Sequence, residues 1–282
     1  MKRRFMQVDV FTETPYHGNA LAVVVDGAGV PEQAMRALTR WTNLSETAFL
    51  LPPSDPRADY RVRIFTPSGA DPMGTELPFA GHPTIGSCHA WLEAGGQPRR
   101  PDVVVQECPA GLVSLRRTGG GLAFAAPPLV RSGPVAPDLV RHVADVLRID
   151  VTRIIDSAWV DNGPGWVAVL LGSADEVLAL RPGFVDIDLG VVGPCPPGSP
   201  EAFEVRAFLP QNGATLEDPV TGSLNASLAG WLLGTGRAQS PYIARQGTAL
   251  ARQGRVHISQ DADGTVWVGG HAITCISGQV DM

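Results

Sequence analysis

RIFTP, at Arg63–Pro67, opens the stretch that decides the fold. The Arg, Ile, Phe and Thr of this run predict a strand, which Pro67 ends. An acidic residue, Glu76, follows, and the turn Gly81-His82-Pro83 then opens a helix, with proline where its missing N–H costs no hydrogen bond. The first half of the chain therefore contains a unit of strand, acidic residue, small-residue turn and helix.

The second half repeats this unit. VRAFLP, at Val205–Pro210, is followed by Glu217 and Asp218, and Thr221-Gly222-Ser223 then opens another helix. The corresponding parts stand at similar distances along the chain. We therefore infer a duplicated fold, in which two helix N-termini can converge on a cleft.

Short strands and few helices make up the rest of both halves. Runs rich in Val, Ile, Phe and Thr lie between turn residues, and the 282 residues include 32 glycines and 25 prolines. A Pro-rich stretch, Pro127–Pro137, has the composition of a linker between domains. We expect an α+β fold with half-domains at 1–127 and 137–282 and an active-site cleft between them.

Composition and charge exclude several classes of partner. The net charge is −6 and no basic block occurs, so nucleic acid is not an expected ligand. No apolar run is long enough to span a membrane, and Lys2, Arg3 and Arg4 are not followed by the apolar segment of a signal peptide. We therefore expect a cytoplasmic globular protein with no membrane partner.

The sequence also lacks the motifs of common metal and cofactor sites. Four scattered cysteines form no CxxC pair, and no HxxH or HExxH spacing occurs, so a metal site and a disulfide framework are not expected. A GxGxxG turn, a GxxxxGK[ST] loop and a GxSxG elbow are all missing. Nicotinamide, ATP and serine-hydrolase chemistry are therefore disfavoured.

The two helix starts are candidate carboxylate-binding sites. Helix N-termini present backbone N–H groups without partners and a positive dipole end. Glycine at Gly81 and Gly222 allows a ligand to approach the backbone closely. Ordinary helix capping is the alternative at each turn. Taken as a symmetric pair, the turns favour a small anionic metabolite as substrate.

Four side chains are candidates for acid/base chemistry. Glu46 lies between a predicted helix and a predicted strand, where burial would raise its pKa toward the range useful for proton transfer. Asp218 precedes a proline, while Ser223 and His82 each follow the glycine of a helix-opening turn. From the residues alone, an exposed turn glutamate, a turn aspartate and a helix-capping serine remain alternatives.

Seven motifs together resemble the PhzF-like family of phenazine-biosynthesis-type isomerases. They run in the family's order and cover nearly the whole chain: VDVFT (Val8–Thr12), GNALAVVVD (Gly18–Asp26), NLSETAFL (Asn43–Leu50), RIFTP, ELPFAGHPTIG (Glu76–Gly86), EDPVTGSLNASLAGWL (Glu217–Leu232) and VWVGGHA (Val266–Ala272). The resemblance implies two pseudo-symmetric domains, each a β-barrel-like sheet around a central helix, as in diaminopimelate epimerase. It also implies a homodimer.

The resemblance assigns roles to individual residues. The family's best-understood reaction isomerises 2,3-dihydro-3-hydroxyanthranilate by a proton shift, without a metal or an organic cofactor. Glu46 matches the glutamate that removes and redelivers the proton. Catalytic roles are also implied for His82, Asp218 and Ser223, and substrate-binding roles for Gly81, Gly222 and Asn19.

One contrast with related epimerases, one departure from the family and two alternatives accompany this resemblance. Related epimerases carry a cysteine at each helix start, whereas His82-Pro83 and Gly222-Ser223 occupy those turns here. The loop Ser68–Thr75 is longer than the family leads us to expect, and such a loop would change the pocket. The alternatives to a proton-shifting isomerase are a cysteine-dependent epimerase, acting through Cys88, and a non-catalytic metabolite-binding protein.

Overall fold

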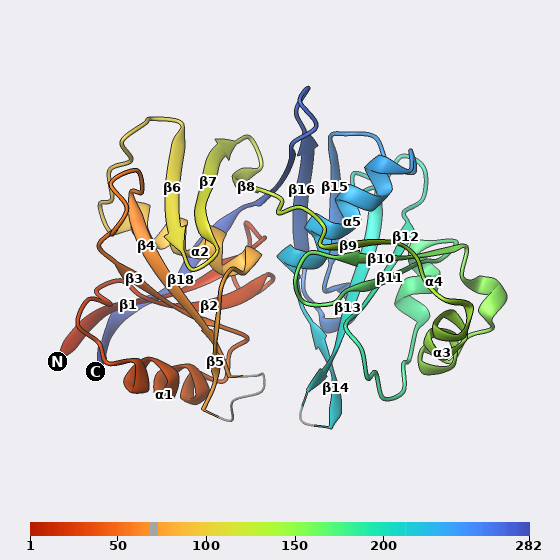
Figure 1. The fold of residues 1–282 in the computed structure, drawn as a ribbon, viewed down its shortest axis with the longest axis horizontal. Helices are drawn as coiled ribbons and strands as arrows, with labels where there is room; N and C mark the ends of the chain where they lie inside the picture. The colour runs from red at the N-terminus through yellow and green to blue at the C-terminus, as the bar shows by residue number, and fades with distance from the viewer. Residues whose placement is uncertain (68–72, 212) are drawn as a thin grey trace. The chain divides into compact units, whose positions relative to one another are not determined.

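The chain folds into two compact units, each built on strands with few helices. The computed structural model describes residues 1–67, 73–211 and 213–282. The first unit contains Met1–Ala125 and Gly269–Met282, and the second contains Ala126–Val268 (Figure 1). The predominance of strands confirms the expected α+β fold.

The end of the second half-domain requires a correction. We expected it to run from 137 to 282, but residues 269–282 belong to the first unit. The last strand, β18 (Ala272–Asp281), pairs antiparallel with β1 (Lys2–Val10), from Val10 opposite Ala272 to Lys2 opposite Asp281. A pairing between strands so distant in the sequence leaves no local pattern from which it could be predicted.

In the first unit, the strands surround helix α2. This helix is buried from Gly81 to Cys88, and it contacts strands on several sides of the sheet, namely β1, β2, β3, β4, β6, β8 and β18. Strands β1 and β2 are antiparallel, β2 and β3 parallel, β3 and β4 antiparallel, and β4 and β6 parallel. The elements are β1, β2 (Asn19–Val24), α1 (Glu32–Thr42), β3 (Thr47–Leu51), β4 (Tyr60–Thr66), β5 (Thr75–Leu77), α2 (Gly81–Glu93), β6 (Val103–Cys108), β7 (Gly111–Thr118), β8 (Gly121–Ala125) and β18.

The second unit has the same plan around helix α5. Its pairs β10–β11, β11–β12, β12–β13 and β13–β15 are antiparallel, parallel, antiparallel and parallel, in the order seen in the first unit. In the described ranges, no helix of either unit is both long and apolar enough to cross a membrane. The elements are β9 (Arg131–Pro134), α3 (Pro137–Leu147), β10 (Asp156–Asp161), β11 (Val167–Leu170), α4 (Ala174–Ala179), β12 (Leu189–Pro194), β13 (Phe203–Gln211), β14 (Ala214–Asp218), α5 (Gly222–Gly234), β15 (Tyr242–Gln246), β16 (Gly254–Gln260) and β17 (Val266–Gly270), with short 3-10 turns at Val151–Arg153 and Thr248–Leu250.

The repeat extends to the register of the strands. Thr47 of β3 lies opposite Phe65 of β4, and Leu189 of β12 lies opposite Phe208 of β13. Each phenylalanine stands two residues after an arginine, and each arginine lies over the ring of its phenylalanine, at 4.9 and 4.8 Å from the ring centre. Residues 47 and 189 are therefore equivalent positions of one repeated framework. The inferred duplication is confirmed at this level of detail.

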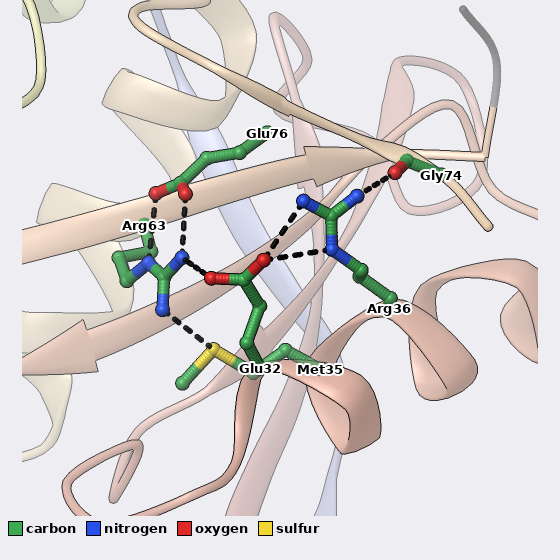
Figure 2. Close-up of polar contacts among 6 residues, drawn as sticks. All are labelled: Glu32, Met35, Arg36, Arg63, Gly74 and Glu76. Carbon is green, nitrogen blue, oxygen red and sulfur yellow. Dashed lines mark hydrogen bonds and ion pairs between the residues drawn. The ribbon is translucent and has the colours of Figure 1, made fainter. Parts of the chain in front are cut away.

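In each unit, an arginine–glutamate pair joins the two strands that precede the central helix. These strands are β4 and β5 before α2, and β13 and β14 before α5. Arg63 Nε donates to Glu76 Oε1 at 2.7 Å, and Nη2 makes a second bond to Oε2 (Figure 2). Arg206 makes the same two bonds to Glu217, at 2.8 and 2.7 Å. Because both pairs are bidentate, they fix the orientation as well as the separation of the strands that lead to α2 and α5.

Helix α1 is attached to the first of these pairs. Glu32 bonds Arg63 at 2.6 Å and Arg36 at 2.8 Å, and Arg36 also donates to the carbonyl of Gly74 (Figure 2). Gly74 belongs to the loop Ser68–Thr75, which we expected to alter the pocket. Residues 68–72 of that loop lie outside the described residues, so the expectation stays a prediction. The end of the loop is held by α1.

Candidate active site

Glu46 and His82 meet in the first unit. Glu46 directly precedes β3, and His82 is the second residue of α2. His82 Nε2 lies 3.4 Å from Glu46 Oε2, and the two side chains are only 6% and 16% exposed. Alternate residues of a strand share a face, so Glu46 lies on the same side of β3 as the fully buried Ala48. The structure thus brings together two of the predicted catalytic residues.

Burial controls the charge of His82. It lowers the pKa of the imidazole to about 3, so the ring is neutral in neutral solution. Within the described residues, Nε2 has no hydrogen-bond partner. The approach to Glu46 is therefore a contact between a neutral imidazole and a carboxyl group, rather than an ion pair. A buried nitrogen without a partner in this position is available to a substrate.

The start of α2 is open to an anion. Gly81 is its first residue, and the preceding Ala80 provides no side-chain cap. Pro83 has no N–H to contribute, so Gly81 and His82 carry the first-turn N–H groups that point out of the helix. Two N–H donors and the positive end of the helix dipole then lie beside Glu46 and His82, which suits a carboxylate group.

In the second unit, the turn before α5 gathers Asp218, Gly222 and Ser223. Asp218 ends β14 and is 8% exposed, and one of its oxygens accepts the Thr221 hydroxyl at 2.6 Å. Gly222 begins α5, where the preceding Thr221 gives no side-chain cap. The Ser223 hydroxyl accepts the indole N–H of Trp166 at 3.2 Å, which leaves its own proton free to be donated.

Two buried glutamines hold these helix starts, and the sequence analysis missed both. Gln106 of β6 donates to the Thr84 hydroxyl in α2 at 3.0 Å. Gln246 of β15 accepts the side-chain N–H of Asn225 in α5 at 2.8 Å. Each glutamine sits on the strand that runs parallel to the arginine-bearing strand of its unit. Each glutamine has a charged neighbour in its strand, Glu107 in β6 and Arg245 in β15, so the sequence offered no clear signal.

Asn19, predicted to bind substrate, is the first residue of β2 and is only 2% exposed. It lies in the first unit, opposite Val10 of β1. The preceding Gly18 donates its backbone N–H to Asp9 at 3.0 Å, and a Cβ there would lie 2.1 Å from the Val10 carbonyl oxygen. Only glycine fits at that position, so the backbone before Asn19 is tightly constrained.

Cysteine chemistry finds little support at the helix starts. Cys88 is fully buried, and burial raises the pKa of its thiol to about 12, so the thiolate needed for proton abstraction is scarce near neutral pH. Cys108, Cys195 and Cys275 are also free thiols with raised pKa values. In the part of the chain that the structure describes, no group of three or more His, Cys, Asp or Glu side chains could hold a metal ion.

A neutral histidine thus lies beside a carboxyl group, at an uncapped helix start in a duplicated α+β framework. The chain belongs to the PhzC-PhzF family of phenazine biosynthesis-like proteins, whose family model matches residues 8–278. This match confirms the resemblance that the seven motifs indicate.

Individual relatives agree with this assignment. Antisense-enhancing sequence 1 of Schizosaccharomyces pombe is 34% identical, over 98% of this chain and 97% of its own length. Trans-2,3-dihydro-3-hydroxyanthranilate isomerase of Pseudomonas fluorescens is 31% identical, over 88% of this chain and 87% of its own length. The crystal structure of a PhzF-family phenazine biosynthesis protein from Bacillus anthracis matches with a TM-score of 0.84, at 20% identity and over 100% of both chains. At the level of the family, the names of the relatives support an isomerase.

Proposed function

We propose that this protein is an isomerase that shifts a proton within a small carboxylate metabolite, with Glu46 as the group that carries the proton. The contact between Glu46 and His82 at the open start of α2 is the observation that carries the proposal. The first-turn N–H groups of Gly81 and His82 hold the substrate carboxylate, and Gly222 offers the same contact in the second unit. Neither a metal nor an organic cofactor takes part.

The proton transfer needs no second reactant. The Glu46 carboxylate takes a proton from an acidic C–H, and the electron pair of that bond enters the conjugated system of the substrate. The resulting carboxylic acid then gives the proton to another carbon of the same system, so that a new C–H bond forms and the carboxylate is restored. His82, because it is neutral, orients the substrate by hydrogen bonding without competing for the proton.

Asp218 and Ser223 orient further polar groups of the substrate. The Ser223 hydroxyl has a proton to donate, while Asp218 is fixed by its bond from Thr221. The relative from Pseudomonas fluorescens is named for its action on trans-2,3-dihydro-3-hydroxyanthranilate, which makes this compound the first to test. We further propose a cytoplasmic homodimer, as the family resemblance implies, and light scattering at several concentrations tests the dimer.

Proton NMR in D₂O tests the proposed reaction. The protein is incubated with trans-2,3-dihydro-3-hydroxyanthranilate and a panel of small cyclic and amino-acid-like carboxylates, beside Glu46→Gln. We expect isomerisation, or deuterium uptake at one carbon, and a loss of at least about 100-fold in the variant. Near wild-type turnover in Glu46→Gln would refute its role. Measurable affinity without exchange, across the whole panel, would replace the isomerase with a metabolite-binding protein.

A further inference from the structure

The second unit carries a carboxyl group at the sheet position that Glu46 occupies in the first. The register described above makes Thr47 of β3 equivalent to Leu189 of β12. Both also pair with a parallel strand, β2 for Thr47 and β11 for Leu189. Glu46 directly precedes the first of these residues and Asp188 directly precedes the second. The two acidic side chains are therefore counterparts in the repeat.

Asp188 lies on the side of β12 that faces α5. A Cβ added to Gly190 would lie 2.4 Å from Leu224 Cδ1, so this side of the strand packs directly against α5. Asp188 is two residues from Gly190, and residues two apart share a face and stand about 7 Å apart. Leu224 directly follows Ser223 at the start of the helix. In the first unit the same geometry brings Glu46 to the second residue of α2.

The backbone ties Asp188 to the loop that holds Ser223. Its carbonyl oxygen accepts the N–H of Val167 at 2.9 Å. The preceding residue, Trp166, donates its indole N–H to the Ser223 hydroxyl at 3.2 Å. Asn162 of the same loop donates to the Ser223 carbonyl at 3.0 Å, and its own side-chain oxygen is buried without a hydrogen-bond partner among the described residues. Among the described residues, a buried side-chain oxygen without a hydrogen-bond partner, that of Asn162, thus lies beside Ser223.

The surroundings of Asp188 stabilise its protonated form relative to that of an exposed aspartate. Burial, and then the negative charge of Asp161 on β10, raise its pKa to about 6. The Asp161 side chain is held in place by its own turn, because one of its oxygens accepts the N–H groups of Gly163 and Gly165 at 2.6 and 2.7 Å. No hydrogen bond or ion pair is made by the Asp188 carboxyl group within the described residues. On the same segment, Asp186 forms an exposed ion pair with His142 at 2.8 Å.

We propose that Asp188 is a second catalytic acid/base residue, which protonates an oxygen of a substrate bound at the start of α5. The inference rests on the proposed function. As the carbon-bound proton is removed, the electron pair moves through the conjugated system to that oxygen, and the Asp188 carboxylic acid supplies it with a proton. When the proton is returned to another carbon, the new O–H bond breaks and Asp188 takes its proton back. The Asp188 carboxyl group ends as it began.

Asp188→Asn tests the inference, with Asp186→Asn as its matched control two residues away. Deuterium exchange into trans-2,3-dihydro-3-hydroxyanthranilate and the carboxylate panel is followed from pH 5 to pH 9. We expect kcat to fall about 100-fold in Asp188→Asn, with KM changed less than about threefold, and both to be unaltered in Asp186→Asn. The wild-type rate should fall as Asp188 loses its proton, and this fall should be absent from the variant. Unaltered kcat and an unaltered pH profile in Asp188→Asn overturn the inference.

Asp161→Asn provides an independent readout. The amide oxygen can still accept the two backbone bonds of the turn, but the negative charge is gone. The fall in rate should therefore move to lower pH, by up to about one pH unit. If Asp188 had only a structural role, the pH profile would not move in Asp161→Asn. An unmoved profile therefore contradicts the inference.

The possible failures can be told apart. If deuterium exchange is lost in Glu46→Gln but retained in Asp188→Asn, the inference is wrong and the proposed function remains intact. No exchange by the wild type on any compound removes the proposed function and, with it, the catalytic role of Asp188. A ¹³C NMR titration of the aspartate carboxyl groups, assigned by Asp188→Asn, needs no substrate. A titration midpoint near pH 6 for Asp188 supports its proposed role as a proton donor, and a midpoint below about pH 4.5 contradicts that role.

Discussion

Gln246 binds the backbone and the side chain of Thr221 at once: its amide oxygen accepts the Thr221 N–H at 3.0 Å, and its amide N–H groups donate to the Thr221 hydroxyl at 2.9 Å. The same glutamine donates to the carbonyl of Asp218 at 3.0 Å. One buried side chain thus holds the whole turn from Asp218 to the start of α5, and the position of two candidate catalytic residues depends on it.

Gln246→Leu should therefore destabilise the protein by about 2–4 kcal/mol, because buried polar groups of the turn lose their partner. Gln106→Leu is the matched control. Gln106 has two such bonds, from Tyr60 at 2.8 Å and to Thr84 at 3.0 Å, so we expect a smaller loss. Urea unfolding followed by tryptophan fluorescence measures both. Equal losses, or a loss below about 1 kcal/mol in Gln246→Leu, would contradict the role assigned to Gln246.

The buried His82 predicts a specific dependence of stability on pH. Its folded pKa, about 3, lies below the ordinary value of 6.5, so the unfolded chain binds more protons between these values. Stability conferred by this group is present above pH 6.5 and is lost as the pH falls toward 3, by about 1.4 kcal/mol per pH unit. His82→Asn should remove that part of the slope, whereas His142→Asn, at an exposed site, should keep it. Urea midpoints at pH 7, 5.5 and 4.5 are the measurement.

Thiol chemistry should be dispensable. Because burial keeps Cys88 protonated and inaccessible, Cys88→Ser is expected to retain turnover within about threefold, unless the buried hydroxyl reduces the amount of folded protein. Turnover per folded molecule, with the folded fraction taken from circular dichroism, separates these effects. Treatment of the wild type with iodoacetamide provides the second test. Complete and parallel loss of activity in both experiments would revive the cysteine-dependent epimerase.

The two arginine–glutamate pairs should differ in their importance for stability. The Arg206 and Glu217 side chains are 5% and 14% exposed, against 22% and 24% for Arg63 and Glu76. Removal of one partner of a buried pair leaves an uncompensated charge, so Arg206→Met should cost about 3–5 kcal/mol. Arg63→Met should cost less, because water can reach Glu76. Thermal unfolding of the two variants measures both losses of stability. A larger loss in Arg63→Met than in Arg206→Met would contradict the prediction.

The sequence predicted the repeated parts of the fold better than the connections between them. RIFTP and VRAFLP carry the residue types of strands, and the glycine turns mark where both central helices begin, so local pattern was enough. Strand β12 and helix α4 were missed, because they lie in a stretch broken by Gly and Pro. Asp188 was missed with them, since an acid before an unrecognised strand looks like any turn residue. Its relation to Glu46 is visible only when the registers of the two sheets are compared.

The same limit applies to the candidate site. Glu46 and His82 stood out through their motifs, but their contact depends on the packing of β3 against α2, which no local pattern encodes. The neutrality of His82 likewise depends on burial by residues far away in the sequence. Gln106 and Gln246 have no sequence neighbours that reveal their hydrogen bonds. Long-range packing therefore determines most of the chemistry of the site.

The pairing of β18 with β1 sets an order of events during translation. A ribosome delivers residues 126–268 as one uninterrupted piece, whereas the sheet around α2 stays open until residues 272–281 have left the exit tunnel. The second unit can therefore complete its folding while β1 still has a free edge, and the part of the protein that holds Glu46 and His82 closes last. An exposed strand edge invites pairing with other chains. Slow synthesis of the final residues would prolong that exposure, and a chaperone that covers β1 would shorten it.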